Sequence, residues 1–200
     1  MAVQESTVLP EQAAPGVPRA DWKSILLMMV NPAGVLKKRM AGISPIWAMA
    51  VSGLAFTLFF LQTGMDLHRN GQSLLIIPVL ALIGFFYGTA VVSGIAVLAW
   101  LLSRPFGGQR PIGWSIKAFA LGYSPALVYT VMGLPLNLIF HWNTAIAFGV
   151  TGMLWALGPM VATIRELTGQ KISVSILVAS ISGGLLLLGW SLLSMGISFS

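Results

Sequence analysis

Few residues in this 200-residue chain have the chemistry that catalysis needs. It has no cysteine, and its two histidines, His68 and His141, fall in segments that we predict as loops. Asp66, His68 and Arg69 together could bind a metal or a proton, but a zinc site needs at least three protein ligands. We therefore interpret this cluster as a solvated loop, and we expect no enzymatic activity, no metal and no cofactor.

Ser124 is the one residue placed like an intramembrane nucleophile. It stands in the sequence Gly-Tyr-Ser-Pro, inside a long apolar segment. A serine nucleophile needs a nearby base. No histidine falls within any predicted membrane span, so a serine protease is excluded.

The same segment predicts an interrupted helix. Pro125 has no N–H to donate to the carbonyl of Leu121, and its ring crowds that carbonyl. In hydrocarbon the freed carbonyl needs another donor, which Ser124 or Tyr123 could supply. Pro159 in the next span crowds the carbonyl of Trp155 in the same way. We predict kinks that form a hinge or a shallow ligand cavity, made by Gly122, Tyr123, Ser124, Pro125 and Pro159.

Composition places these residues in a membrane. Hydrophobic residues make up 56% of the chain and charged residues 8%, whereas soluble domains carry about 25% charged residues. A water-soluble fold could not cover its surface with so few charges. This excludes an ordinary cytosolic enzyme, a disordered chain and a nucleic-acid-binding domain. We predict an all-α polytopic membrane protein.

Five segments are long and apolar enough to cross a bilayer, which takes about 20 residues each. Ser44, Asn143 and Ser173 are the expected helix caps, and Gln62–Gly64 is the expected end of the first span. A rival count has four spans, with a re-entrant third region. The predicted spans, in a membrane domain over 42–200, are about 45–62, 76–102, 112–132, 143–164 and 173–197.

Charge placement favours five spans. Ten of the eleven lysines and arginines fall in the N-terminal region and the second and fourth connections, leaving only Arg69 elsewhere. By the positive-inside rule the N-terminus is cytoplasmic and the C-terminus outside. Basic and non-basic connections alternate between the two sides of the membrane only if the region 112–140 crosses it.

The N-terminal region divides in two. Residues 1–20 are polar and rich in proline, so we predict a disordered cytoplasmic tail rather than a signal peptide. Residues 21–41 are predicted as interfacial amphipathic helices, capped by Asp21 and interrupted at Asn31-Pro32. The apolar face of the first helix would carry Trp22, Ile25, Leu26 and Met29.

Basic residues beside these helices indicate a lipid contact. Lys37, Lys38 and Arg39 are consecutive, and we expect them to meet anionic headgroups. Lys117 lies about one turn into the third span, from where its side chain can reach the same headgroups. A phosphate or ligand contact is the alternative role for this lysine.

Two further features concern packing. Gly84 and Gly88 have the small-xxx-small spacing that lets helices approach closely. We favour packing within one chain, and the alternative is a seam between two copies in a homo-oligomer. Asn137 is predicted near the surface opposite the basic loops, in a turn.

The pattern resembles the Yip1 family. A Trp-containing amphipathic stretch ending in a proline spans 22–32, and Gly-Tyr-Ser-Pro at 122–125 is followed by Leu134-Pro135. The resemblance covers about 20–197 and implies a cytoplasmic N-terminal region, five spans and a non-enzymatic, bacterial-type membrane protein. Eukaryotic members carry an Asp-Leu-Tyr-Gly-Pro motif and contact Rab GTPases. This chain lacks the motif, so that activity is not carried over.

The expected function is therefore that of a membrane organiser or adaptor in a bacterial cytoplasmic membrane. It would act through its cytoplasmic N-terminal face, with anionic lipid and a protein as partners. One alternative is a small transporter or channel using the kinked third and fourth helices. Another is an accessory subunit of a larger membrane complex. A transport path would be polar and lined by Ser124, Thr130, Asn137 and Thr151.

Overall fold

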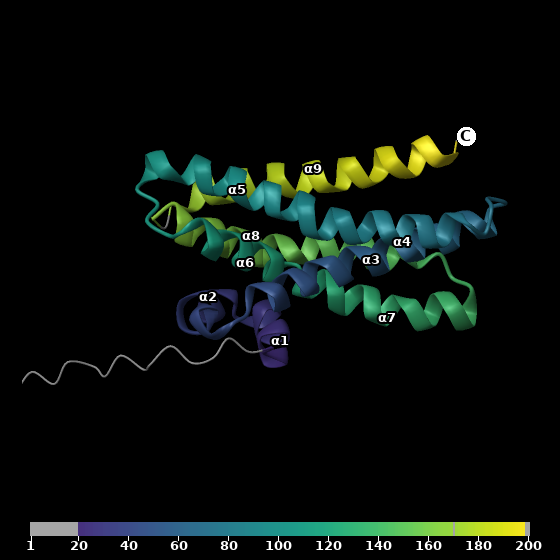
Figure 1. Ribbon diagram of the computed structural model, residues 1–200, viewed down its shortest axis with the longest axis horizontal. Coiled ribbons are helices and arrows are strands. Elements are labelled where there is room, and N and C mark those ends of the chain that lie inside the picture. The colour runs from purple at the N-terminus through teal and green to yellow at the C-terminus, as the bar shows by residue number, and fades with distance from the viewer. Residues whose placement is uncertain (1–19, 170, 199–200) are drawn as a thin grey trace, which may run out of the picture.

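The computed structural model describes residues 20–169 and 171–198, and these form an all-helical bundle. Residues 1–19 of the predicted tail lie outside this range. Long helices run side by side, and two short helices, α1 (Trp22–Val30) and α2 (Pro32–Lys38), sit near one end of the bundle (Figure 1). Five helical segments are long and apolar enough to cross a membrane, as predicted: Pro45–Arg69, Ile76–Phe106, Ile112–Phe140, Ala145–Leu167 and Ile172–Leu192.

The first span, α3 (Pro45–Arg69), is longer than predicted. It begins as expected, with the Ser44 hydroxyl accepting a hydrogen bond from the amide of Trp47 at 3.5 Å. The predicted end at Gln62–Gly64 is wrong. Gly64 instead allows a close approach, because a Cβ there would lie 2.9 Å from the Cα of Ile77. The helix continues to Arg69 and stops before Gly71, which has a positive φ of 99°.

The second span combines α4 (Ile76–Phe86), a π-helical segment (Tyr87–Val91), α5 (Val92–Ser103) and a 3-10 turn (Arg104–Phe106). Its two spaced glycines are buried against α3. A Cβ on Gly84 would lie 2.5 Å from the carbonyl oxygen of Phe56, and one on Gly88 2.4 Å from that of Ser52. Packing within one chain is confirmed. Both glycines are covered by α3 in this structure, and a seam between two copies stays a prediction.

The third span consists of α6 (Ile112–Gly122) and α7 (Ser124–Phe140), with Tyr123 between them. It reaches Phe140 rather than 132, and α7 stays continuous through Pro135. At 29 residues this region is long enough to cross completely.

The last two spans begin at other residues than predicted. A π-helical segment (Ala145–Val150) leads into α8 (Thr151–Leu167), and Thr144, not Asn143, occupies the N-cap position. Helix α9 (Ile172–Ser198) already includes Ser173, which therefore is not its cap.

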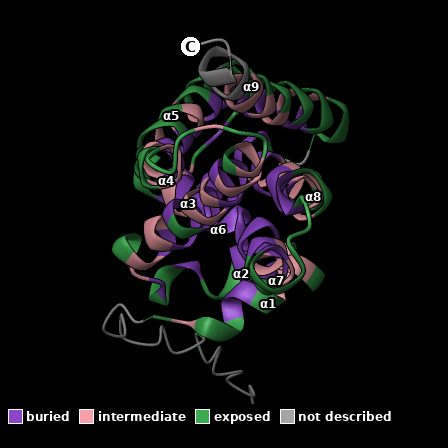
Figure 2. Cartoon of the chain, turned by 90° about the vertical axis from the view of Figure 1, so that its right-hand side faces the viewer, coloured by how far each residue is buried: buried purple, intermediate pink, exposed green. Residues whose placement is uncertain are grey.

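The core forms around α3, which the other helices surround when the bundle is viewed along its length (Figure 2). Phe56, Phe59 and Phe60 of α3 are fully buried. The third span is 61% buried in its most apolar stretch, against 28% for the second and 22% for the fifth. The second and fifth spans therefore offer the largest apolar surface to lipid.

Candidate functional site

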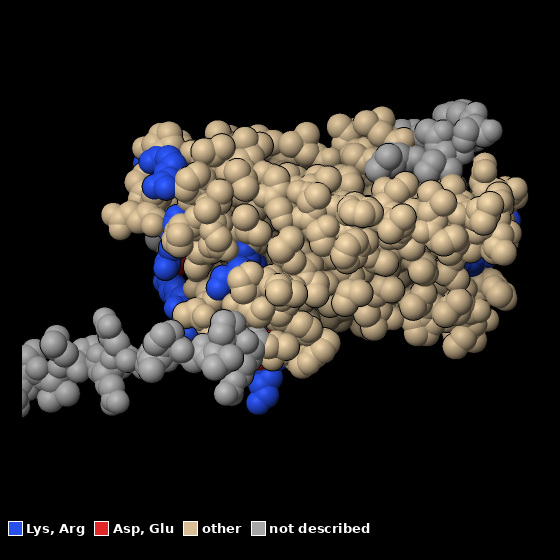
Figure 3. Space-filling model, in the orientation of Figure 1, with Lys and Arg blue, Asp and Glu red and all other residues tan. Residues whose placement is uncertain are grey.

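Basic side chains gather at one end of the bundle, which we call the basic end (Figure 3). The alternating crossings bring together α2, the connection between α5 and α6, the start of α6 and the connection between α8 and α9. The middle of the molecule in this view carries almost no charged side chain. The basic end is therefore the first candidate functional site.

Helices α1 and α2 are tied to each other by polar contacts. The carboxylate of Asp21 accepts a hydrogen bond from the Ser24 hydroxyl and pairs with Arg39, whose Nη1 lies 3.0 Å from Oδ2. The Ser24 hydrogen bond, reinforced by the Arg39 guanidinium, holds the pKa of Asp21 below its usual value. Asp21 occupies the predicted N-cap position, but its side chain binds these groups rather than a backbone amide.

The apolar residues of α1 do not share one face. Ile25 and Met28 are buried, because α1 packs against α2, α7 and α8. Trp22, Leu26 and Val30 recur every fourth residue and are 66%, 61% and 85% exposed. The predicted grouping of Trp22 and Leu26 with Ile25 is therefore wrong. The helix has one apolar face toward the protein and a second that is largely exposed, where the Trp22 ring packs edge-on against Trp47 with ring centroids 4.2 Å apart.

A cavity of about 580 Å³ opens at the basic end, between the segment 36–49 and the start of α6. Its wall carries three cations, Lys37, Arg110 and Lys117, among apolar side chains that include Trp114. Arg110 was not a predicted site residue. Its place in the second basic connection was a usable signal, since that connection must return to the end of the bundle that Lys37 also occupies.

One carboxylate balances two of these cations. Glu166 Oε1 lies 3.7 Å from Lys37 Nζ, and its Oε2 accepts a hydrogen bond from Arg110 at 3.1 Å. Both cations keep considerable exposure, 58% for Lys37 and 41% for Arg110. The three cations against one acid leave the cavity with a net positive charge.

Lys117 binds the protein backbone. Its Nζ donates to the carbonyl oxygens of Met40 at 2.7 Å and Ile43 at 3.2 Å, joining α6 to the 3-10 turn Met40–Gly42. An ammonium has three N–H donors, so these two bonds leave one for another acceptor. A contact of Lys117, Lys37, Lys38 or Arg39 with lipid stays a prediction.

The third span is divided at Tyr123, within the segment 122–125, and the kink predicted there stays a prediction. The freed carbonyl of Leu121 accepts a hydrogen bond from the Ser124 hydroxyl at 2.6 Å, one of the two donors we expected. The break faces the second proline, because a Cβ on Gly122 would lie 3.7 Å from the Cβ of Pro159. Helix α8 is continuous through Pro159, and a hinge at either position stays a prediction.

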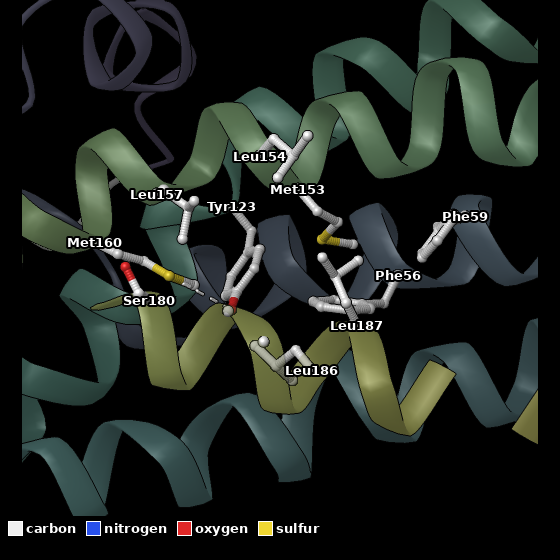
Figure 4. A pocket seen from close by; sticks show the side chains of 12 residues that line it. Phe56, Phe59, Tyr123, Met153, Leu154, Leu157, Met160, Ser180, Leu186 and Leu187 are labelled. Atoms are coloured by element: carbon white, nitrogen blue, oxygen red, sulfur yellow. Dashed lines mark hydrogen bonds between the residues drawn. The ribbon is translucent and has the colours of Figure 1, made fainter. Parts of the chain in front are cut away.

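A second cavity, of about 210 Å³, lies beside this break. Figure 4 shows Tyr123 projecting into it between side chains of α3, α8 and α9. Tyr123 is the only one of the five predicted hinge residues that lines it. Gly122, Ser124, Pro125 and Pro159 contribute to the helix break and its packing, not to the cavity wall.

The opposite end holds a buried polar network that the sequence did not predict. Asn137 is fully buried within α7, so its predicted place in a turn is wrong. Its amide donates to Asp66 Oδ1 and to the Thr144 hydroxyl, both at 2.8 Å. Thr144 donates to Gln62 at 2.8 Å, and Arg69 binds both Asp66 and Asn137. The spacing of Gln62, Asp66 and Arg69 on one helix face was an available signal.

This network changes the interpretation of the histidine region. Asp66 and His68 lie in α3 rather than in a loop. His68 and His141 border one hollow of about 230 Å³, and Nδ1 of His68 lies 2.7 Å from the carbonyl oxygen of Gln72. Among the described residues, no three His, Cys, Asp or Glu side chains are placed to hold a metal ion.

Comparison with protein-family models, curated proteins and solved structures finds no match for this chain. The resemblance to the Yip1 family therefore stays a prediction from motifs. The assignment as a multi-pass membrane protein depends on composition and on the five apolar helices.

Proposed function

We propose that this chain is a non-enzymatic membrane organiser of the Yip1 type, and that it acts on one leaflet of a bacterial cytoplasmic membrane. The observation that carries the proposal is the outward face of α1. Trp22, Leu26 and Val30 form one exposed apolar line beside the basic residues of α2. A soluble surface would gain nothing from such a line, whereas a membrane interface would bury it.

The basic end is assigned to the cytoplasm. Of the ten lysines and arginines among the described residues, nine belong to segments at that end, with Arg69 on the other side. A cytoplasmic reporter should be active when fused before Trp22 or within 104–111, and inactive after Ser200. Activity at both termini would mean an even number of spans and would refute the orientation.

Insertion of α1 would wedge one leaflet apart. Burying each large apolar side chain contributes about 1.5–3 kcal/mol. Each nearby basic residue adds about 1 kcal/mol on an anionic leaflet. Lys38 is exposed, whereas Lys37 pairs with Glu166 and Arg39 with Asp21. The cavity with Lys37, Arg110 and Lys117 would accept a headgroup phosphate, as basic pockets beside membrane helices do.

The test uses the full chain reconstituted in vesicles that contain anionic phospholipid. The variant Trp22→Gln/Leu26→Gln/Val30→Gln should insert normally but lose the ability to deform vesicles into tubules, followed by electron microscopy. The matched control is Trp142→Gln, which removes a tryptophan 58% exposed at the opposite end and should leave deformation unchanged. Equal deformation by the triple variant and wild type would refute the proposal.

The two alternatives have less support. A transport path needs free polar groups, but Thr130 donates to the carbonyl of Ala126 at 2.8 Å and Asn137 belongs to the network. A role as accessory subunit, and a protein partner at α1, stay predictions. Purification in native lipid with identification of bound proteins tests both.

A further inference from the structure

Tyr123 carries a buried hydroxyl with an inadequate partner. The residue is 1% exposed. Among the described residues its hydroxyl has one polar contact, the Met160 sulfur at 4.0 Å, and a thioether is a weak acceptor. Tyr87, the neighbouring buried tyrosine, instead donates to the carbonyl of Leu186 at 2.8 Å. Tyr123 thus retains an O–H donor that faces the cavity (Figure 4).

The cavity is reachable from the lipid. Its inner wall is formed by Phe56 and Tyr123, both fully buried. Its outer wall includes Leu154 of α8 and Gly184 of α9, which are exposed. Nothing lies within 4 Å of a Cβ built on Gly184, so no other helix covers this part of the cavity wall.

The depth of Tyr123 excludes the ordinary acceptors of a bilayer. Along the helix axis, Tyr123 lies about 16 Å from Ile112 at the start of α6, at about 1.5 Å per helical residue. This is near the middle of a hydrocarbon core about 30 Å thick. Water is absent there, and the ester carbonyls of phospholipids stay near the headgroups. An acceptor for Tyr123 must arrive on a molecule that is itself apolar.

We propose that the cavity binds an uncharged apolar carbonyl compound of the prenylquinone class, with the Tyr123 hydroxyl donating to its carbonyl oxygen. An apolar cavity of roughly 150 Å³ holds a benzene molecule, so about 210 Å³ accommodates a substituted six-membered ring. Met153 and Met160 supply sulfur contacts to such a ring. The tail would leave past Gly184. A fatty acid fits poorly, since no cation lines the cavity and a buried carboxylate is unfavourable. This site is independent of the proposed action of α1.

The experiment titrates the full chain in nanodiscs with decylubiquinone and with decylbenzene, which has the ring and the tail but no carbonyl. Decylubiquinone should bind more tightly. Tyr123→Phe should weaken its binding roughly threefold to tenfold, the range of one hydrogen bond, and leave decylbenzene unaffected. The control Tyr129→Phe removes a hydroxyl from a ring that stacks on Trp155 outside the cavity, and should change neither affinity.

A second pair of variants locates the site. Gly184→Phe should block decylubiquinone. Gly94→Phe, at a glycine equally free of atoms within 4 Å but in the second span, should not. Circular dichroism checks that each variant is folded. The proposal is overturned if neither ligand binds, if the two ligands bind equally, if Tyr123→Phe binds decylubiquinone like wild type, or if Gly184→Phe still binds it.

Discussion

Gly88→Ala measures how strongly the second span depends on its close approach to α3. A Cβ at this position would lie 2.4 Å from the carbonyl oxygen of Ser52, whereas ordinary contacts begin at 3.4 Å. The backbone of α3 cannot rotate away like a side chain, so the two helices must separate by about 1 Å. A gap of 0.5–1 Å loses roughly a quarter to a half of each dispersion contact. Inserting a methyl into a packed interface costs about 1–3 kcal/mol, and we expect the free energy of unfolding to fall by that amount.

The matched control is Gly94→Ala in the same span, where a Cβ would have no atom within 4 Å. Alanine favours a helix over glycine by about 1 kcal/mol, so this variant should be as stable as wild type or slightly more. Unfolding is followed by circular dichroism in mixed detergent micelles, and the oligomeric state by light scattering. If Gly88→Ala loses no more stability than Gly94→Ala, the packing argument is wrong. If Gly88→Ala instead abolishes a dimer without changing the stability of the monomer, these glycines form a contact between two copies.

Three further predictions concern polar groups. The hydrogen bond from Ser24 lowers the pKa of Asp21 in the folded state. The Asp21 carboxylate therefore stabilises the fold above pH 3.8, and this stabilisation is lost as the pH falls through the lowered pKa. Tryptophan fluorescence should report loosening of α1 over that pH range, and Asp21→Asn should remove the pH dependence. Asn137→Leu leaves the partners of a fully buried amide without hydrogen bonds, and the free energy of unfolding should fall by about 1–3 kcal/mol for each unsatisfied group. The control Asn143→Leu changes an exposed residue, and its free energy of unfolding should stay within about 0.5 kcal/mol of wild type. Ser124→Ala should lower the free energy of unfolding by about 0.6 kcal/mol, the average for a side-chain hydrogen bond between membrane helices. The double variant Ser124→Ala/Pro125→Ala should recover this stability, because alanine in place of the proline restores an amide donor for the Leu121 carbonyl. If a double-mutant cycle shows no recovery, the freed carbonyl is not the reason that Ser124 stabilises the helix.

Features that depend on composition or on neighbouring residues could be predicted from the sequence. The low fraction of charged residues indicated a membrane protein, and apolar length indicated five spans. The break at Tyr123 and its donor Ser124 followed from the backbone chemistry of one proline. Each of these is decided within a single helical segment.

Features that depend on contacts between helices could not be predicted. Gln62 and Gly64 looked like the end of a span, yet α3 continues because α4 covers the glycine and the polar network satisfies the glutamine. The two apolar sides of α1 were assigned to one face, since only the bundle decides which side is covered. Asn137, read as a turn residue, is buried because its partners come from α3 and from the residue before the fourth span.

The sequence by itself thus determined where the chain is apolar, where a backbone donor is missing and where small residues permit close packing. Only the tertiary structure decided which polar side chains meet and which stay unpaired. The physical reason is that a hydrogen bond acts over about 3 Å, while Asp66 and Asn137 are 71 residues apart along the chain. The Tyr123 hydroxyl is the same kind of result, because its weak acceptor, the Met160 sulfur, is set by the helices packed around it.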